Sequence, residues 1–464
     1  MAYNRKQRLN DNIKAIETAF ILDREQRTPT ARERLLLERY CGFGGLKCIL
    51  NPARELADAV HWAKSDLELF APTVELHRLI RENSKNESEY KQLMDSLKQS
   101  VLTAFYTPSA VTEALTDVLK EHQIIPEKVL EPSAGIGAFV DSVLDNNPKA
   151  DIMAFEKDLL TGKILRHLHP EQKVRIEGFE KIEKPFNDYF DLAISNIPFG
   201  DVAVFDPSYT AMKGMRALVT RRIHNYFFVK ALDTVRDGGL VAFITSQGVL
   251  NAKNNSAARF MMLYHADLVS AIRLPNNLFT ENANTEVGSD LIILQKNTQK
   301  ESLRGDDNLL DTVYNDENRI PTNNYFLEHP ERIIHTTAKL DTDPFGKPAM
   351  IYTHEDGVEG IAEDLRKMLH EDFKKNLNLN RYLGIEETKA EEVKEVEETE
   401  KIEETEKMKP SIEEKQNDTV VSLQKQEKPT DDAELSQKSN HQQPPVQMTL
   451  FDLWGMEEEN RQAV

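Results

Sequence analysis

The chain has 464 residues, with 58 lysine and arginine against 78 aspartate and glutamate residues, a formal net charge of −20 and two cysteines. This length predicts two or three structural units, and two cysteines exclude a disulfide framework or a zinc site built on cysteine pairs. The polar start and the absence of any apolar run near roughly 18 residues predict neither a signal peptide nor a membrane helix. We therefore expect a cytoplasmic protein, without a metal site.

Residues 1–100 predict an N-terminal helical region. Apolar side chains recur there at helical spacing, as in Ile13, Ile16 and Phe20. The glycine cluster at residues 42–45 predicts a loop between helices.

From about residue 125, short apolar runs alternate with helical segments, which is typical of an α/β fold with a parallel, doubly wound sheet. The runs lie at residues 129–130, 152–155, 174–176, 190–194, 240–244, 268–274 and 291–294. The helical segments lie at residues 139–146, 160–167 and 225–236. A polar loop without a helical pattern joins the last two runs, so we expect them to form an antiparallel pair that completes seven strands.

The first predicted strand ends at Glu131 and enters a turn with Gly135 and Gly137, followed by a helix. Glycines two apart in a strand-to-helix turn let a ligand approach the backbone closely. Glu156 lies 25 residues after Glu131, at the end of the next strand, where an acid can hold ribose hydroxyls. The pattern predicts a ligand that contains a nucleoside; the alternative is a tight turn and a surface glutamate.

The fourth predicted strand ends in Ser195, Asn196, Ile197, Pro198, Phe199 and Gly200. Ligands bind at the carboxyl ends of strands in open α/β sheets. Pro198 and Gly200 favour a defined turn, in which the Asn196 amide and the Ile197 carbonyl could accept both hydrogens of an exocyclic amine. Phe199 would supply a stacking face for a base, worth on the order of 1–3 kcal/mol. Taken alone, this tetrapeptide is a common loop sequence.

With the glycine turn before it, the tetrapeptide resembles the motif of the DNA adenine-N6 methyltransferases (N-6 DNA methylases) that depend on S-adenosylmethionine. The resemblance implies a seven-stranded, Rossmann-like methyltransferase sheet. It also implies methyl transfer to N6 of adenine in DNA, with the base flipped out of the duplex. The residues that it places at the catalytic site are Asn196, Ile197, Pro198 and Phe199.

The resemblance covers roughly residues 100–300, which we expect to form the methyltransferase domain (101–300). It implies that the methionine part of the cofactor is covered by Tyr106, Thr107 and Pro108. It places Glu131, Ser133, Gly135 and Gly137 along the methionine and ribose, Glu156 at the ribose hydroxyls and Glu180 near the adenine ring. Residues 301–385 predict a small mixed appendage, and residues 320–353 resemble the segment that follows the methylase domain in larger phage and mobile-element proteins.

A basic loop follows the Asn196 turn and contains Lys213, Arg216, Arg221 and Arg222. We interpret these side chains as contacts to DNA phosphates. An ordinary solvated loop is the competing interpretation.

Residues 386–464 hold 22 acidic against 10 basic residues, a net charge of −12. The segment 386–445 has almost no aromatic residues and predicts a disordered acidic linker, with a Glu/Lys-rich helix as the alternative for its first half. Residues 446–464 predict a docking peptide, because an apolar island follows this linker. Gln447, Leu450 and Phe451 resemble the motif by which bacterial proteins bind the replication sliding clamp; a nonspecific or intramolecular contact is the alternative.

Two other functions fit the same sequence. The acceptor could be RNA or a protein glutamine, because related enzymes use similar turns. The chain could also be a non-catalytic accessory protein that binds DNA or the clamp. The basic loop and the order of the motifs favour DNA as the acceptor, and the intact Glu131, Glu156 and Asn196 argue against a decayed site.

Overall fold

The computed structural model describes residues 4–385, apart from 104–105, 213, 281–285, 304–306, 315–319 and 344–345. The predicted linker and docking peptide, with Gln447, Leu450 and Phe451, lie outside the described residues, and so does Lys213. None of the described helices combines the length and apolar character that crossing a bilayer requires. Within the same ranges, no three His, Cys, Asp or Glu side chains are grouped as a metal ion would need.

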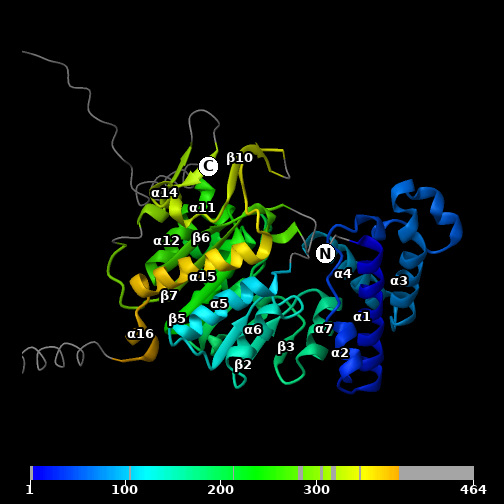
Figure 1. The fold of residues 1–464 in the computed structure, drawn as a ribbon. Coiled ribbons are helices and arrows are strands. Elements are labelled where there is room, and N and C mark those ends of the chain that lie inside the picture. Colours follow the sequence, from blue (N-terminus) through cyan, green and yellow to red (C-terminus); the bar gives the residue numbers. More distant parts are fainter. Residues whose placement is uncertain are drawn as a thin grey trace, which may run out of the picture. The chain divides into compact units, whose positions relative to one another are not determined.

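A seven-stranded sheet forms the centre of the structure (Figure 1). Its strands are β1 (Lys128–Glu131), β2 (Asp151–Phe155), β3 (Lys173–Arg175), β4 (Phe190–Asn196), β5 (Val235–Ser246), β6 (Ala266–Leu274) and β7 (Ser289–Lys296). Their order is β3-β2-β1-β4-β5-β7-β6, with parallel pairing from β3 to β5 and with β7 antiparallel to both β5 and β6. The predicted α/β sheet and its antiparallel last pair are confirmed, because only a parallel pair needs a long crossover between its strands.

Helices cover both faces of the sheet. One face carries α5 (Ser109–Glu121), α6 (Ala138–Asn146) and α15 (Gly357–Asn376), and the other carries α10 (Ile223–Thr234) and α12 (Ser256–His265). The sequence did not predict α12. Helix α15 comes from the segment expected to be an appendage, yet its Leu365 and Leu369 are fully buried in the same core as Ile272 of β6. Figure 1 shows α15 beside α5 on the same face of the sheet.

The N-terminal helices share one apolar core with α7 (Leu159–Leu168), next to the β3 edge of the sheet (Figure 1). They are α1 (Arg5–Glu25), α2 (Ala31–Leu37), α3 (Phe70–Glu82) and α4 (Glu87–Thr103). Leu93 and Leu97 of α4 share one apolar core with Leu160 and Ile164 of α7. This packing fixes α4 beside the carboxyl ends of β1 and β2.

Short elements complete the described chain. The short helices include η4 (Phe179–Lys181), α8 (Pro207–Thr210), α9 (Met215–Val219), α11 (Gly248–Asn251), η7 (Asn276–Phe279), α14 (Asn324–Glu328) and α16 (Leu379–Leu383). Two small antiparallel pairs join β8 (Thr312–Tyr314) to β9 (Pro321–Asn323) and β10 (Thr337–Thr342) to β11 (Pro348–Thr353).

Candidate active site

The turn after β1 brings the backbone close to a neighbouring aromatic ring and to an acid. Gly135 and Gly137 have φ of +56° and +97°, which favour glycine. A Cβ on Gly135 would lie 2.8 Å from the Tyr106 ring, so a side chain there would strain the backbone and collide with the ring. The Gly135 N–H donates to Oε2 of Glu156 at 2.8 Å. The predicted glycine turn and the predicted acid of β2 are therefore in direct contact.

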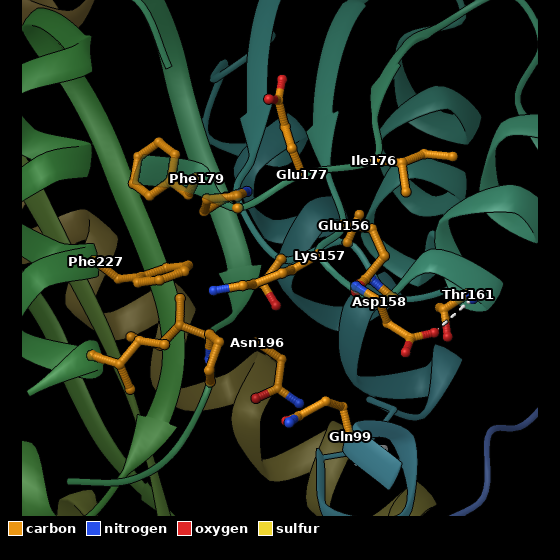
Figure 2. Close-up of a pocket in the computed structure, with 18 of the residues that line it drawn as sticks. Gln99, Glu156, Lys157, Asp158, Thr161, Ile176, Glu177, Phe179, Asn196 and Phe227 are labelled. Atoms are coloured by element: carbon orange, nitrogen blue, oxygen red, sulfur yellow. Dashed lines mark hydrogen bonds between the residues drawn. The ribbon is translucent and has the colours of Figure 1, made fainter. Parts of the chain in front are cut away.

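A second acid continues this arrangement. Oε1 of Glu156 accepts the Asp158 N–H at 2.6 Å, and Oδ1 of Asp158 accepts the Thr161 N–H at 2.8 Å as the N-cap of α7 (Figure 2). Ser96 of α4 donates its hydroxyl to Oδ2 of Asp158 at 2.5 Å. Burial of its carboxyl and the charge of Asp158 raise the pKa of Glu156 to about 8, although the backbone N–H donors favour the ionised form.

Glu131 lies below the turn and is 1% exposed. Its Oε1 accepts the Ser133 N–H at 3.4 Å, whereas its buried Oε2 has no hydrogen-bond partner among the described residues. Burial raises the pKa of this carboxyl to about 8. The buried Ser195 hydroxyl lies near this carboxyl and opposes the rise in its pKa.

The turn after β4 ends the sheet ladder. Asn196 pairs with Ile244 of β5, and the Ile197 N–H donates to the Ile244 carbonyl at 3.0 Å. Pro198 has no N–H and cannot continue the ladder, so the chain leaves the sheet there. The Phe199 ring packs edge-on against Phe279 of η7, with the ring centroids 6.3 Å apart.

One cavity of about 970 Å³ joins these two strand ends. The predicted site residues that line it are Tyr106, Thr107, Ser133, Gly135, Glu156, Glu180, Asn196, Ile197, Pro198 and Phe199. Glu131 and Gly137 do not line the cavity, and Pro108 borders a smaller cavity of about 310 Å³. Glu180 lies 3.7 Å from the Lys157 ammonium. In Figure 2, Glu156 and Asp158 lie on one side and Asn196 and Phe227 on the other.

Helix α4 contributes a wall of the cavity that was not predicted from the sequence. Gln92, Asp95, Ser96 and Gln99 of this helix line the cavity, and Figure 2 shows the Gln99 side chain reaching toward Asn196. Their spacing of three and four residues places them on one helix face, and this polar face was readable in the sequence. Asp158 was also readable, because an aspartate just before a helical pattern is a common N-cap. Phe179 and Phe227 complete the wall beside Asn196.

The predicted basic side chains lie apart from the cavity lining. Arg216 holds Asp233 with both guanidinium nitrogens, at 2.5 and 3.0 Å, and this carboxylate raises the pKa of Arg216. Arg222 lies 3.2 Å from the exposed Asp201. Arg221 is exposed, and no ion pair connects it to another described residue. Among the described cations of this loop, Arg216 is structural, Arg222 is paired with an exposed aspartate and Arg221 is available to a partner.

Proteins of known name resemble parts of the chain. Defense against restriction protein B of Escherichia phage P1 is 29% identical over 201 residues, which are 42% of this chain and 8% of that protein. Type II methyltransferase M.XamI of Xanthomonas campestris pv. amaranthicola is 25% identical over 173 residues, 34% of this chain and 33% of that protein. The chain thus spans a third or less of the length of these relatives.

Solved structures also resemble it. A class I S-adenosylmethionine-dependent methyltransferase of Listeria monocytogenes is 15% identical, with a TM-score of 0.37 over 64% of this chain and 90% of that one. The modification subunit of a type I restriction enzyme from Vibrio vulnificus is 14% identical, with a TM-score of 0.37 over 74% of this chain and 89% of that one.

A family model gives the assignment. The model described as N-6 DNA Methylase matches residues 88–391, more than half of the chain. The match begins inside α4 and runs past α16, so it includes the whole sheet, both strand ends of the cavity and α15. The chain belongs to the N-6 DNA methylase family of S-adenosylmethionine-dependent methyltransferases.

Proposed function

We propose that the chain transfers a methyl group from S-adenosylmethionine to N6 of an adenine in DNA. The observation that carries this proposal is the shared cavity, in which the Gly135–Glu156 contact and the Asn196 turn line the same space. A nucleoside cofactor and an acceptor base could therefore meet inside one enclosure, which is the arrangement that methyl transfer requires.

The residues around the glycine turn fit this cofactor. Glu156 lines the cavity and suits the ribose hydroxyls, whereas Glu131 lies outside the lining and would hold the Ser133 backbone in place beside the cofactor. Gly135 and Tyr106 would border the methionine part, and Glu180 would lie toward the adenine ring. When bound, S-adenosylmethionine supplies a methyl group activated by the adjacent sulfonium.

The Asn196 turn would hold the acceptor. A duplex hides adenine N6, so the base must leave the stack, at a cost of a few kcal/mol. The Asn196 amide oxygen and the Ile197 carbonyl would accept the two N6 hydrogens, which directs the nitrogen lone pair at the methyl group. Phe199 would stack on the base, braced by Phe279. The proton can leave the cationic product to water, so no dedicated base is required.

The test combines radiolabelled S-adenosylmethionine with unmethylated plasmid DNA, followed by digestion to nucleosides and mass spectrometry. We expect N6-methyladenine. No label on DNA, with a label on RNA or on a protein glutamine in parallel reactions, would change the acceptor. Failure to bind S-adenosylmethionine in calorimetry would favour a non-catalytic accessory protein.

DNA binding gives a prediction for the basic loop. Arg221→Gln should lower affinity for DNA and reduce the slope of log K against log salt by about 0.9, the value for one phosphate contact. Its thermal stability should stay unchanged, because Arg221 is exposed. The matched variant Arg216→Gln should instead lower the free energy of unfolding by about 1–3 kcal/mol, because it leaves Asp233 without its bidentate partner. Fluorescence anisotropy at several salt concentrations and thermal melts measure both. A stable Arg216→Gln protein with a reduced salt slope would reverse the two roles.

A further inference from the structure

An exposed aromatic side chain lies at the rim of the cavity. Phe205 is 79% exposed and lines the cavity together with Val202, which is 60% exposed. Both residues follow the Asn196 turn directly in the chain. Apolar side chains grouped at the rim of a functional cavity are typical of an interaction site, because removing their surface from water favours binding.

The backbone on both sides of Phe205 is fixed. The Val204 N–H donates to the Thr220 carbonyl at 2.8 Å. Asp206 is 3% exposed and accepts hydrogen bonds from the Ser208 N–H at 2.8 Å and from the Tyr226 hydroxyl at 2.7 Å. The ring is therefore presented on a rigid support, so little conformational entropy would be lost when it binds.

The surroundings of Phe205 suit nucleic acid. The exposed Arg221 follows in the same segment, and Arg222 is paired only with Asp201, whose side chain is itself 70% exposed. Aromatic rings interleaved with cations are the usual surface for nucleic-acid bases and phosphates. The apolar side chains alone would also suit a protein partner. The adjacent base-binding cavity favours DNA, because a protein partner would have no use for that cavity.

We propose that Phe205 enters the base stack of the duplex as the target adenine turns into the cavity. Apolar side chains inserted between base steps stabilise such unstacked DNA. The ring would occupy the gap that the adenine leaves and would contact the bases on either side. The inference rests on the proposed function and adds the side chain that keeps the duplex open.

The experiment compares two DNA substrates. One is a duplex oligonucleotide with an unmethylated adenine at a site that the wild-type protein methylates. The other is the same duplex with an abasic site opposite that adenine, where flipping costs less. Phe205→Ala should slow methylation by about 10- to 100-fold on the paired substrate and by less than about threefold on the abasic one, because a base–aromatic stack is worth 1–3 kcal/mol. Phe205→Leu should retain most of the rate, because leucine also acts as a wedge.

A second readout does not depend on methyl transfer. With 2-aminopurine in place of the target adenine, the fluorescence rise on binding should be smaller for Phe205→Ala than for wild type. Leu56→Ala is the matched control, because Leu56 is 86% exposed and does not line the cavity. It should behave as wild type in both assays.

Equal losses on the two substrates would overturn the wedge and make Phe205 a wall of the base pocket. No loss on either substrate would overturn it as well. If the wild-type protein methylates neither DNA, the proposed function fails instead, so the two failures are distinguishable.

Discussion

Asn196→Ala is expected to lower the rate of DNA methylation by at least about 10²–10³-fold, the usual cost of removing a hydrogen-bond partner of a reacting group. The side chain lies at the end of β4, on the wall of the cavity. Without its amide oxygen, the acceptor amine would lose one of its two orienting contacts, and its lone pair would no longer be directed at the methyl group. Affinity for the cofactor should stay unchanged, because the glycine turn and Glu156 remain intact.

The control variant is Asn196→Asp, which keeps an oxygen acceptor at the same position and should retain more activity than Asn196→Ala. Asn196 pairs with Ile244 through the backbone register of β4 and β5, so either variant should fold. Thermal melts and calorimetric titration with the cofactor would verify this. Full activity of Asn196→Ala would show that the turn is an ordinary loop.

The strands and both site turns could be predicted because their signals are local. Each strand is a short apolar run, and the markers of the turns, Gly135, Pro198 and Gly200, lie next to the residues that they position. The spacing of the apolar residues and the positions of glycine and proline therefore place the ends of β1, β2 and β4 at one edge of the sheet.

Contacts between distant segments could not be predicted in this way. Ser96 and Asp158 are 62 residues apart, and nothing in either segment indicates their hydrogen bond. The same limit applies to α15, whose amphipathic pattern does not reveal which surface it covers. The pairing of Arg216 with Asp233 shows that a basic residue in a loop can be structural. Partner choice depends on tertiary packing, which a single sequence does not record.

Glu156→Gln is expected to weaken cofactor binding by about 10- to 100-fold at pH 8.5, where the wild-type side chain is ionised and can accept hydrogen bonds from both ribose hydroxyls. The Glu156 carboxylate accepts hydrogen bonds from the backbone N–H groups of Gly135 and Asp158. In the variant, the amide NH₂ group would face one of these two donors, and that hydrogen bond would be lost. The loss should shrink toward pH 6.5, because a carboxyl with a pKa of about 8 is then mostly protonated in the cofactor-free protein. Wild-type affinity should therefore rise with pH up to about 8 and level off above it.

The free energy of unfolding supplies an independent check, with the opposite slope. The ordinary pKa of the group is 4.5 and burial raises it to about 8 in the native state. Between these values the native protein holds a proton that the unfolded chain has released, so this carboxyl makes the cofactor-free protein less stable as pH rises. Glu156→Gln should flatten the affinity profile and reduce the slope of the stability profile, to which Glu131 and Asp141, with pKa values raised in the same direction, also contribute. Calorimetry with S-adenosylhomocysteine and denaturant melts from pH 5 to pH 9 measure the two. A wild-type affinity that is constant from pH 6 to pH 9 would mean that Glu156 is already ionised before the cofactor binds. In that case the backbone N–H donors would lower the pKa of Glu156 by more than burial raises it.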